Sequence, residues 1–139
     1  ASRAQLVQQV IRPALAKGSV VLCDRFYDSS LAYQGYGRGL DLAKVQQAID
    51  LAVGETKPDI TLLLDIPLEV SADRVARRQS ETGESNDQFD RSGDRFFKRV
   101  LDGFHALAEA EPQRYRIINA NHPPDAVSDE IWGALKDQF

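Results

Sequence analysis

The chain has 139 residues, of which 42% are hydrophobic and 27% are charged, and its formal net charge at pH 7 is −4. This length suits one domain or a large part of one, and the acidic balance disfavours a general nucleic-acid-binding surface. Because no apolar run approaches the ~20 residues of a membrane span and no signal peptide is visible, we expect a cytoplasmic protein without membrane contact.

The first stretch of the chain has a helical pattern. Apolar residues recur at three- and four-residue spacing over residues 1–17, which predicts a helix. Lys17 and Gly18 are suited to its end, and Pro13 inside the pattern predicts a kink. Arg3, near the start, is by its position alone an ordinary solvated charge.

A short apolar run follows this helix and ends on two charged residues. Val20-Val21-Leu22-Cys23 has the length and composition of a buried parallel strand, and its single cysteine is interpreted as a small buried apolar side chain. Asp24 and Arg25 come next, where ligands collect at the carboxyl end of a strand in an open α/β sheet. A strand followed by a helix N-cap would explain Asp24 equally well.

Polar side chains and glycines continue from this point. Hydroxyl and amide groups come first, and glycines 35, 37 and 39 surround Arg38, to which we assign only a part in the glycine turn. The polar residues are Ser29, Ser30, Tyr33 and Gln34. We interpret this segment as a recognition surface built on the end of a strand.

The rest of the chain alternates helical and strand patterns. Near-continuous apolar strands joined by helical crossovers predict an α/β fold with a parallel sheet covered on both faces. The expected elements are a helix at 41–53 capped by Asp41 or a neighbour, a strand at 60–65, a helix from 67, a polar loop at 79–88, a helix from 96, a strand at 115–120 and a helix at 126–135.

Three arginines precede the polar loop: Arg74, Arg77 and Arg78. A guanidinium donates two parallel hydrogen bonds to phosphate and stays charged, so a loop that closes over a nucleotide could carry these residues to its phosphates. The alternative is a solvated helix face. We expect a lid at about residues 74–90.

The string Asp-Arg-Phe-x-x-Ser-x-x-Ala-Tyr-Gln-Gly-x-Gly-Arg-Gly, beginning at Asp24, resembles the signature of bacterial thymidylate kinases. The resemblance covers essentially all 139 residues in order. It implies a P-loop NTPase-type fold, a three-layer parallel sheet flanked by helices, in a single nucleoside-monophosphate-kinase-like domain. It further implies transfer of the γ-phosphoryl group of ATP to dTMP, with Mg²⁺, by a homodimer.

The resemblance also implies roles for individual residues. Arg25 would bind the acceptor phosphate, with Asp24 near the magnesium and the phosphates. The base and deoxyribose would contact Arg3, Ser29, Ser30, Tyr33 and Gln34, with Tyr33 where a ribose 2′-hydroxyl would sit. ATP would contact Arg74 and the loop Asn119, Ala120 and Asn121, and Arg77 and Arg78 would be catalytic lid arginines. The family's Asp-Arg-x-Glu pattern is replaced by Asp87-Gln88-Phe89-Asp90.

The sequence contains no Gly-x-x-x-x-Gly-Lys-Ser/Thr motif, the loop that holds ATP phosphates. We therefore expect the C-terminal two-thirds of a kinase, containing the third to fifth of five strands and inactive by itself. Two alternatives remain open: another deoxynucleoside or nucleotide kinase, and a non-catalytic nucleotide-binding fragment.

Overall fold

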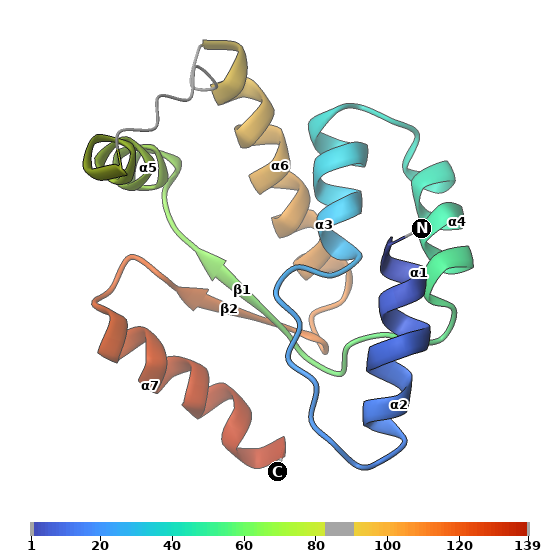
Figure 1. Ribbon diagram of the computed structural model, residues 1–139. Helices are drawn as coiled ribbons and strands as arrows, with labels where there is room; N and C mark the ends of the chain where they lie inside the picture. The colour runs from blue at the N-terminus through green and yellow to red at the C-terminus, as the bar shows by residue number, and fades with distance from the viewer. Residues whose placement is uncertain (1, 83–90, 139) are drawn as a thin grey trace. The chain divides into compact units, whose positions relative to one another are not determined.

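The computed structural model of the chain describes residues 2–82 and 91–138 (Figure 1). These residues form two compact units, one of residues 1–59 and 99–107 and the other of residues 60–98 and 108–139. Most of the predicted lid loop, including Asp87-Gln88-Phe89-Asp90, lies outside the described residues. No helix in the part of the chain that the structure describes is long and apolar enough to cross a membrane.

The first unit opens with a continuous helical stretch, as the sequence predicts. It consists of α1 (Ser2–Leu6), the π-helical segment η1 (Val7–Ile11) and α2 (Arg12–Leu15). The wide turns of η1 end at Ile11, two residues before Pro13, whose missing amide and ring disturb regular helical hydrogen bonding. Gly18, with φ 75°, supplies the left-handed residue in the turn beyond the helix.

The prediction of a buried strand at residues 20–23 is wrong. The segment is extended but pairs with no strand among the described residues, and Leu22 is 93% and Val20 71% exposed. Cys23 is also exposed, contrary to its interpretation as a buried side chain. A strand requires a hydrogen-bonding neighbour as well as apolar side chains, and the described residues supply none here.

The polar and glycine-rich segment forms a helix rather than a series of turns. α3 (Asp28–Ser30) continues into the π-helical segment η2 (Leu31–Gly37). The helix ends because Gly39 adopts φ 72°, which lets the Leu40 amide donate to the Gln34 carbonyl at 3.1 Å. The helix therefore presents its polar residues at fixed positions along successive turns.

The next helix, α4 (Leu42–Val53), confirms the sequence prediction, including its cap. The Asp41 carboxylate accepts hydrogen bonds from the amides of Ala43 and Lys44, at 2.9 and 3.3 Å. At the other end, Arg12 donates to the Val53 carbonyl and to the Thr56 hydroxyl. These contacts tie the end of α4 to α2.

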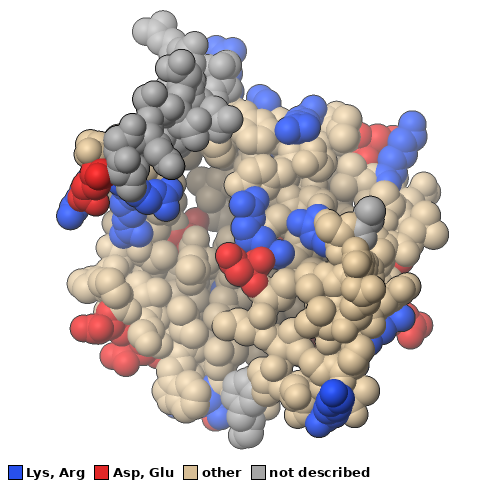
Figure 2. Space-filling view, viewed as in Figure 1, with Lys and Arg blue, Asp and Glu red and all other residues tan. Residues whose placement is uncertain are grey.

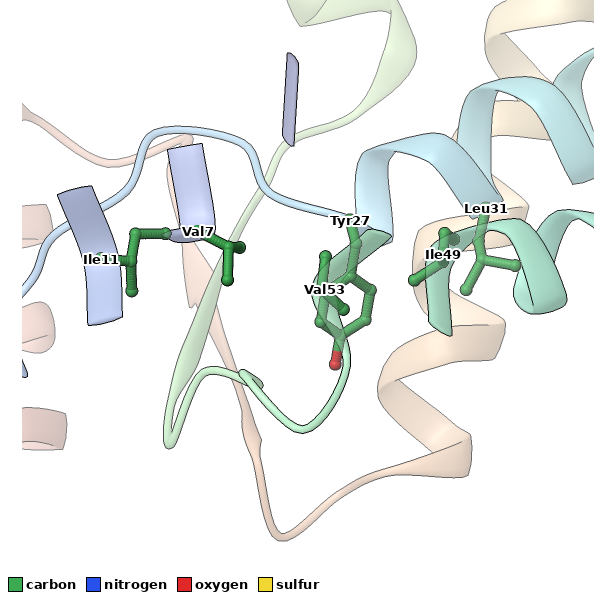
Figure 3. Packing of buried hydrophobic residues seen from close by; sticks show 6 residues of the cluster. All are labelled: Val7, Ile11, Tyr27, Leu31, Ile49 and Val53. Atoms are coloured by element: carbon green, nitrogen blue, oxygen red, sulfur yellow. The ribbon is translucent and has the colours of Figure 1, made fainter. Parts of the chain in front are cut away.

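The core of the first unit is built from these helices. Its buried residues, drawn in Figure 3, are Val7, Ile11, Tyr27, Leu31, Ile49 and Val53. They come from η1, the start of the α3–η2 helix and α4, so one face of each element is buried. Burial of each large apolar side chain contributes about 1.5–3 kcal/mol, which fixes the α3–η2 helix on this side.

The middle of α6 (Arg91–Ala110) completes the first unit. Arg99 donates two hydrogen bonds to the Gly37 carbonyl, at 2.9 Å from Nε and 2.7 Å from Nη2. One turn further along, Gly103 approaches Tyr36 so closely that a Cβ would lie 2.7 Å from the tyrosine side chain. The α3–η2 helix is thus held by α6 as well as by the core.

The second unit contains a two-stranded parallel sheet. β1 (Thr61–Asp65) pairs with β2 (Tyr115–Asn119) in a register that places Thr61 opposite Tyr115 and Asp65 opposite Asn119. The sequence placed both strands within one residue of their observed ends. The helices of this unit are α5 (Leu68–Thr82), α7 (Pro124–Leu135) and the short 3₁₀ turn Lys136–Gln138. Because α5 runs through Thr82, the predicted start of the polar loop at Gln79 is wrong.

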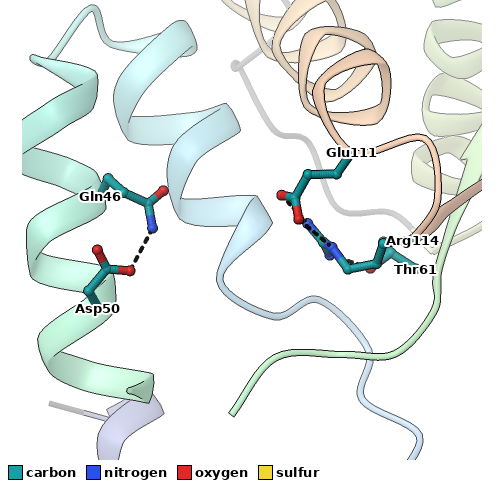
Figure 4. Close-up of polar contacts among 5 residues, drawn as sticks. All are labelled: Gln46, Asp50, Thr61, Glu111 and Arg114. Atoms are coloured by element: carbon teal, nitrogen blue, oxygen red, sulfur yellow. Dashed lines mark hydrogen bonds and ion pairs between the residues drawn. The ribbon is translucent and has the colours of Figure 1, made fainter. Parts of the chain in front are cut away.

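A buried arginine connects the two strands at their beginning. Arg114 is only 6% exposed and donates to both Glu111 carboxylate oxygens, at 3.2 and 2.9 Å (Figure 4). Its third contact is a 2.6 Å hydrogen bond to the Thr61 hydroxyl. This charge is stable in a buried position because it is paired and its donors are satisfied.

The close approach at Gly103 yields a stability prediction. We expect Gly103→Ala to lower the free energy of unfolding by about 1–3 kcal/mol, because the added methyl group collides with Tyr36. The matched control is Gly133→Ala in α7, where nothing lies within 4 Å of the new Cβ. Since alanine favours a helix over glycine, that variant should be unchanged or up to about 1 kcal/mol more stable. Urea unfolding followed by circular dichroism measures both, and equal effects would contradict the contact.

Candidate functional site

Arg25 has an unusual backbone conformation for a residue with a side chain. Its φ is 61°, in the left-handed region, which residues with a Cβ adopt only at a cost of about 1–2 kcal/mol. Its guanidinium carbon lies 4.6 Å from the centre of the Tyr33 ring, and its Nε is 3.5 Å from the Ser29 hydroxyl. The backbone thus turns this side chain onto the α3–η2 helix.

A second guanidinium reaches the same helix. Arg3, in α1, donates from Nη1 to the Ser30 hydroxyl, so two adjacent serines each contact an arginine. Within the described residues, neither Arg3 nor Arg25 forms an ion pair with a carboxylate. Two positive charges beside hydroxyl groups, without acidic partners, make a site suited to an anion.

Tyr33 lies between a charged and an apolar neighbour. Its half-buried ring meets the Phe104 ring edge-on, with centroids 6.4 Å apart and planes at 77°. Gln34, the next residue, is also half-buried. The structure therefore brings five predicted residues together in this unit: Arg3, Arg25, Ser29, Ser30 and Tyr33.

Asp24, the predicted magnesium residue, is exposed. No group of three or more His, Cys, Asp or Glu side chains in the described part of the chain is arranged to hold a metal ion. A lone carboxylate still fits Mg²⁺ bound to a nucleotide, because that ion takes one or two protein carboxylates and fills its other positions with phosphate oxygens and water.

The predicted ATP-contacting residues lie in the second unit, at the carboxyl ends of its two strands. Arg74 of α5 donates from Nη2 to the Ala120 carbonyl at 3.0 Å, and the Ala120 amide donates to the Asp65 carbonyl at 2.9 Å. The Asn119 side chain accepts from the Asn121 amide at 3.0 Å. The structure therefore brings Arg74 next to the loop 119–121, while their predicted contact with ATP stays a prediction.

Arg77 and Arg78, the two arginines predicted to act in a lid, are exposed residues of α5. Arg77 forms a 3.2 Å ion pair with Glu81 one turn along, and the two side chains are 83% and 64% exposed, so the pair contributes little to stability. Among the coloured atoms of Figure 2, basic and acidic side chains are interspersed with uncharged surface.

Some residues that shape these sites were missed by sequence reasoning. Arg99 and Phe104 support the α3–η2 helix and Tyr33, and His122 contacts Asn119 at 3.2 Å between Nε2 and Nδ2. Phe104 was predicted as an apolar residue of its helix, but helical spacing does not say which ring it meets. The only sequence signal for Arg99 is a charge next to the apolar stripe of α6.

Polar residues at the carboxyl ends of parallel strands are typical of α/β nucleotide-binding proteins. Comparison of this chain with known proteins narrows this class to one family. The family model described as thymidylate kinase matches residues 1–131. Thymidylate kinases from Desulfovibrio desulfuricans and a Synechococcus strain are 50% and 48% identical, over 98% and 100% of this chain and 64% of each relative.

A solved structure of a thymidylate kinase is also similar to this chain. The crystal structure of thymidylate kinase from Ehrlichia chaffeensis is similar with a TM-score of 0.69 and 30% identity, over 96% of this chain and 58% of that one. The chain has a P-loop NTPase-type fold and belongs to the thymidylate kinase family. It spans about two-thirds or less of the length of these relatives.

Proposed function

We propose that the protein containing these residues transfers the γ-phosphoryl group of ATP to dTMP, forming dTDP. The observation that carries the proposal is the pair Arg3 and Arg25 on the serines of one helix, in a chain of the thymidylate kinase family. Phosphoryl transfer depends mainly on positioning and on neutralising charge, and arginines supply both.

In this proposal the first unit binds the acceptor. Arg25 holds the dTMP phosphate, Arg3 and the polar residues of the α3–η2 helix hold the thymine and the sugar, and Tyr33 faces the 2′ position. Asp24 would hold Mg²⁺ through water, and that ion would neutralise phosphate charge. Among the described residues neither guanidinium group has a carboxylate partner, which supports this assignment because a phosphate could pair with both.

The second unit would contact ATP through Arg74 and Asn119, Ala120 and Asn121, while Arg77 and Arg78 would approach the transferred phosphate. None of the 139 residues forms the glycine-lysine phosphate loop, so we propose that they are inactive by themselves. From the family alone we further propose a cytoplasmic homodimer, for which light scattering is the test.

The function is tested by measuring ADP release from ATP with dTMP, dUMP, dCMP and thymidine, using the natural polypeptide that contains these residues. Its intact mass is determined first. Preferential use of dTMP supports the proposal, whereas preference for thymidine would indicate a deoxynucleoside kinase. Nucleotide binding without turnover in that polypeptide would indicate a non-catalytic protein.

Arg25→Ala tests the acceptor phosphate site. We expect kcat/KM for dTMP to fall roughly ten- to hundredfold, since a charge-assisted hydrogen bond contributes ~1.5–3 kcal/mol. Arg38→Ala removes a nearby exposed arginine to which we assign no substrate contact and should leave kcat/KM unchanged. An unchanged kcat/KM in Arg25→Ala would refute the assignment.

Tyr33→Ala tests the discrimination between sugars. Because the ring would occupy the space of a 2′-hydroxyl, its removal should raise the relative rate with the ribonucleotide. The measurement is the ratio of kcat/KM for dTMP to that for the matching ribonucleoside monophosphate. If this ratio does not move, the assignment of Tyr33 to the 2′ position is wrong.

Paired substitution of Arg77 and Arg78 by alanine tests the lid. Turnover at saturating substrates should decrease more than the affinity for dTMP, because the arginines would act on the transferred phosphate. Glu81→Ala is the control, since it removes the ion pair but keeps both guanidinium groups. A larger loss of dTMP affinity than of turnover would contradict the lid role.

A further inference from the structure

The contacts of the Arg25 side chain within the first unit indicate a second role for Tyr33, in addition to its proposed place at the sugar. The guanidinium carbon lies 4.6 Å from the Tyr33 ring centre, within the range of a cation–π interaction. The other side-chain contact that Arg25 makes with the described residues, from Nε to the Ser29 hydroxyl, is long at 3.5 Å and therefore weak. The ring is consequently the principal support of this side chain.

The ring itself is held firmly. Phe104 contacts it edge-on, and α6, which carries Phe104, is fixed to the same helix by the two hydrogen bonds from Arg99 to Gly37. A surface arginine ordinarily samples many rotamers, and ordering it on binding costs affinity. A guanidinium already resting on a fixed ring loses less freedom when an anion arrives.

The backbone of Arg25 points to the same conclusion. A left-handed residue with a Cβ persists where its surroundings impose it, and such residues cluster where a side chain must be aimed. Here that conformation directs the side chain toward Tyr33, eight residues further along the chain. The backbone conformation of Arg25 and its contact with the Tyr33 ring therefore both orient the Arg25 side chain.

We propose that Tyr33 is a positioning residue for Arg25: its ring, buttressed by Phe104, pre-orients the guanidinium toward the phosphate of the acceptor nucleotide. The inference rests on the proposed function and adds to it, because it couples the residue that would face the sugar to the residue that would bind the phosphate. Loss of the ring should weaken recognition of the phosphate group specifically.

The test compares the affinities of dTMP and thymidine, measured by calorimetry on the natural polypeptide that contains these residues. The two ligands differ only in the phosphate, so the ratio of their affinities isolates phosphate recognition from changes in the base site. We expect Tyr33→Leu to lower this ratio about two- to fivefold, the loss of one cation–π interaction. Tyr33→Phe keeps the ring and should preserve the ratio.

A double-mutant cycle separates the two proposals. Arg25→Ala should lower the ratio, and adding Tyr33→Leu to it should change the ratio no further. If Arg25→Ala lowers the ratio but Tyr33→Leu alone does not, the positioning role is wrong while the phosphate role stands. If Arg25→Ala leaves the ratio unchanged, the acceptor-phosphate assignment itself is wrong. Should Tyr33→Leu fail to fold, as judged by circular dichroism, Tyr33→Met replaces it with the same expectations.

Discussion

The two hydrogen bonds from the Arg99 guanidinium to the Gly37 carbonyl hold the helix that carries most residues of the candidate acceptor site. They occupy a carbonyl at the end of a helix where no further turn is available to satisfy it. With Tyr27 and Leu31 buried on one side and α6 fixed on another, the helix keeps Ser30, Tyr33 and Gln34 only half-buried, which suits them to contact a ligand. Rigid support of this kind is what a recognition site requires.

In the second unit, too, the residues that stabilise the fold and the residues of candidate function lie at different places. Arg114, buried with Glu111 and Thr61, joins the beginnings of the two strands, whereas the polar residues of candidate function lie at their carboxyl ends. Arg114 thus serves structure through buried, paired contacts, whereas the exposed Arg99 does so through two hydrogen bonds to a backbone carbonyl. Among the described residues, Arg3 and Arg25 differ from Arg114 in having no carboxylate partner, which suits them to an anion.

The strands 61–65 and 115–119, the helix capped by Asp41 and the family were predictable from the sequence, because apolar periodicity and signature spacing are local properties. The buried strand at 20–23 was not, since apolar composition encodes a tendency to be buried but pairing needs a partner. The helix at 28–37 was not predicted because it contains Gly35 and Gly37, and glycine is unfavourable in a helix. Phe104 and Arg99 were missed because contacts across about 70 residues leave no local pattern. The predicted roles of the site residues stay predictions.

The central claim is that the α3–η2 helix and Arg25 bind the nucleoside monophosphate, separately from the loop that follows β2. Backbone amide NMR of the ¹⁵N-labelled natural polypeptide, titrated with dTMP, tests it directly. The account predicts chemical-shift changes across residues 24–34, with residues 119–122 unaffected until ATP is added. Changes confined to residues 119–122, or none at residues 24–34, would contradict it.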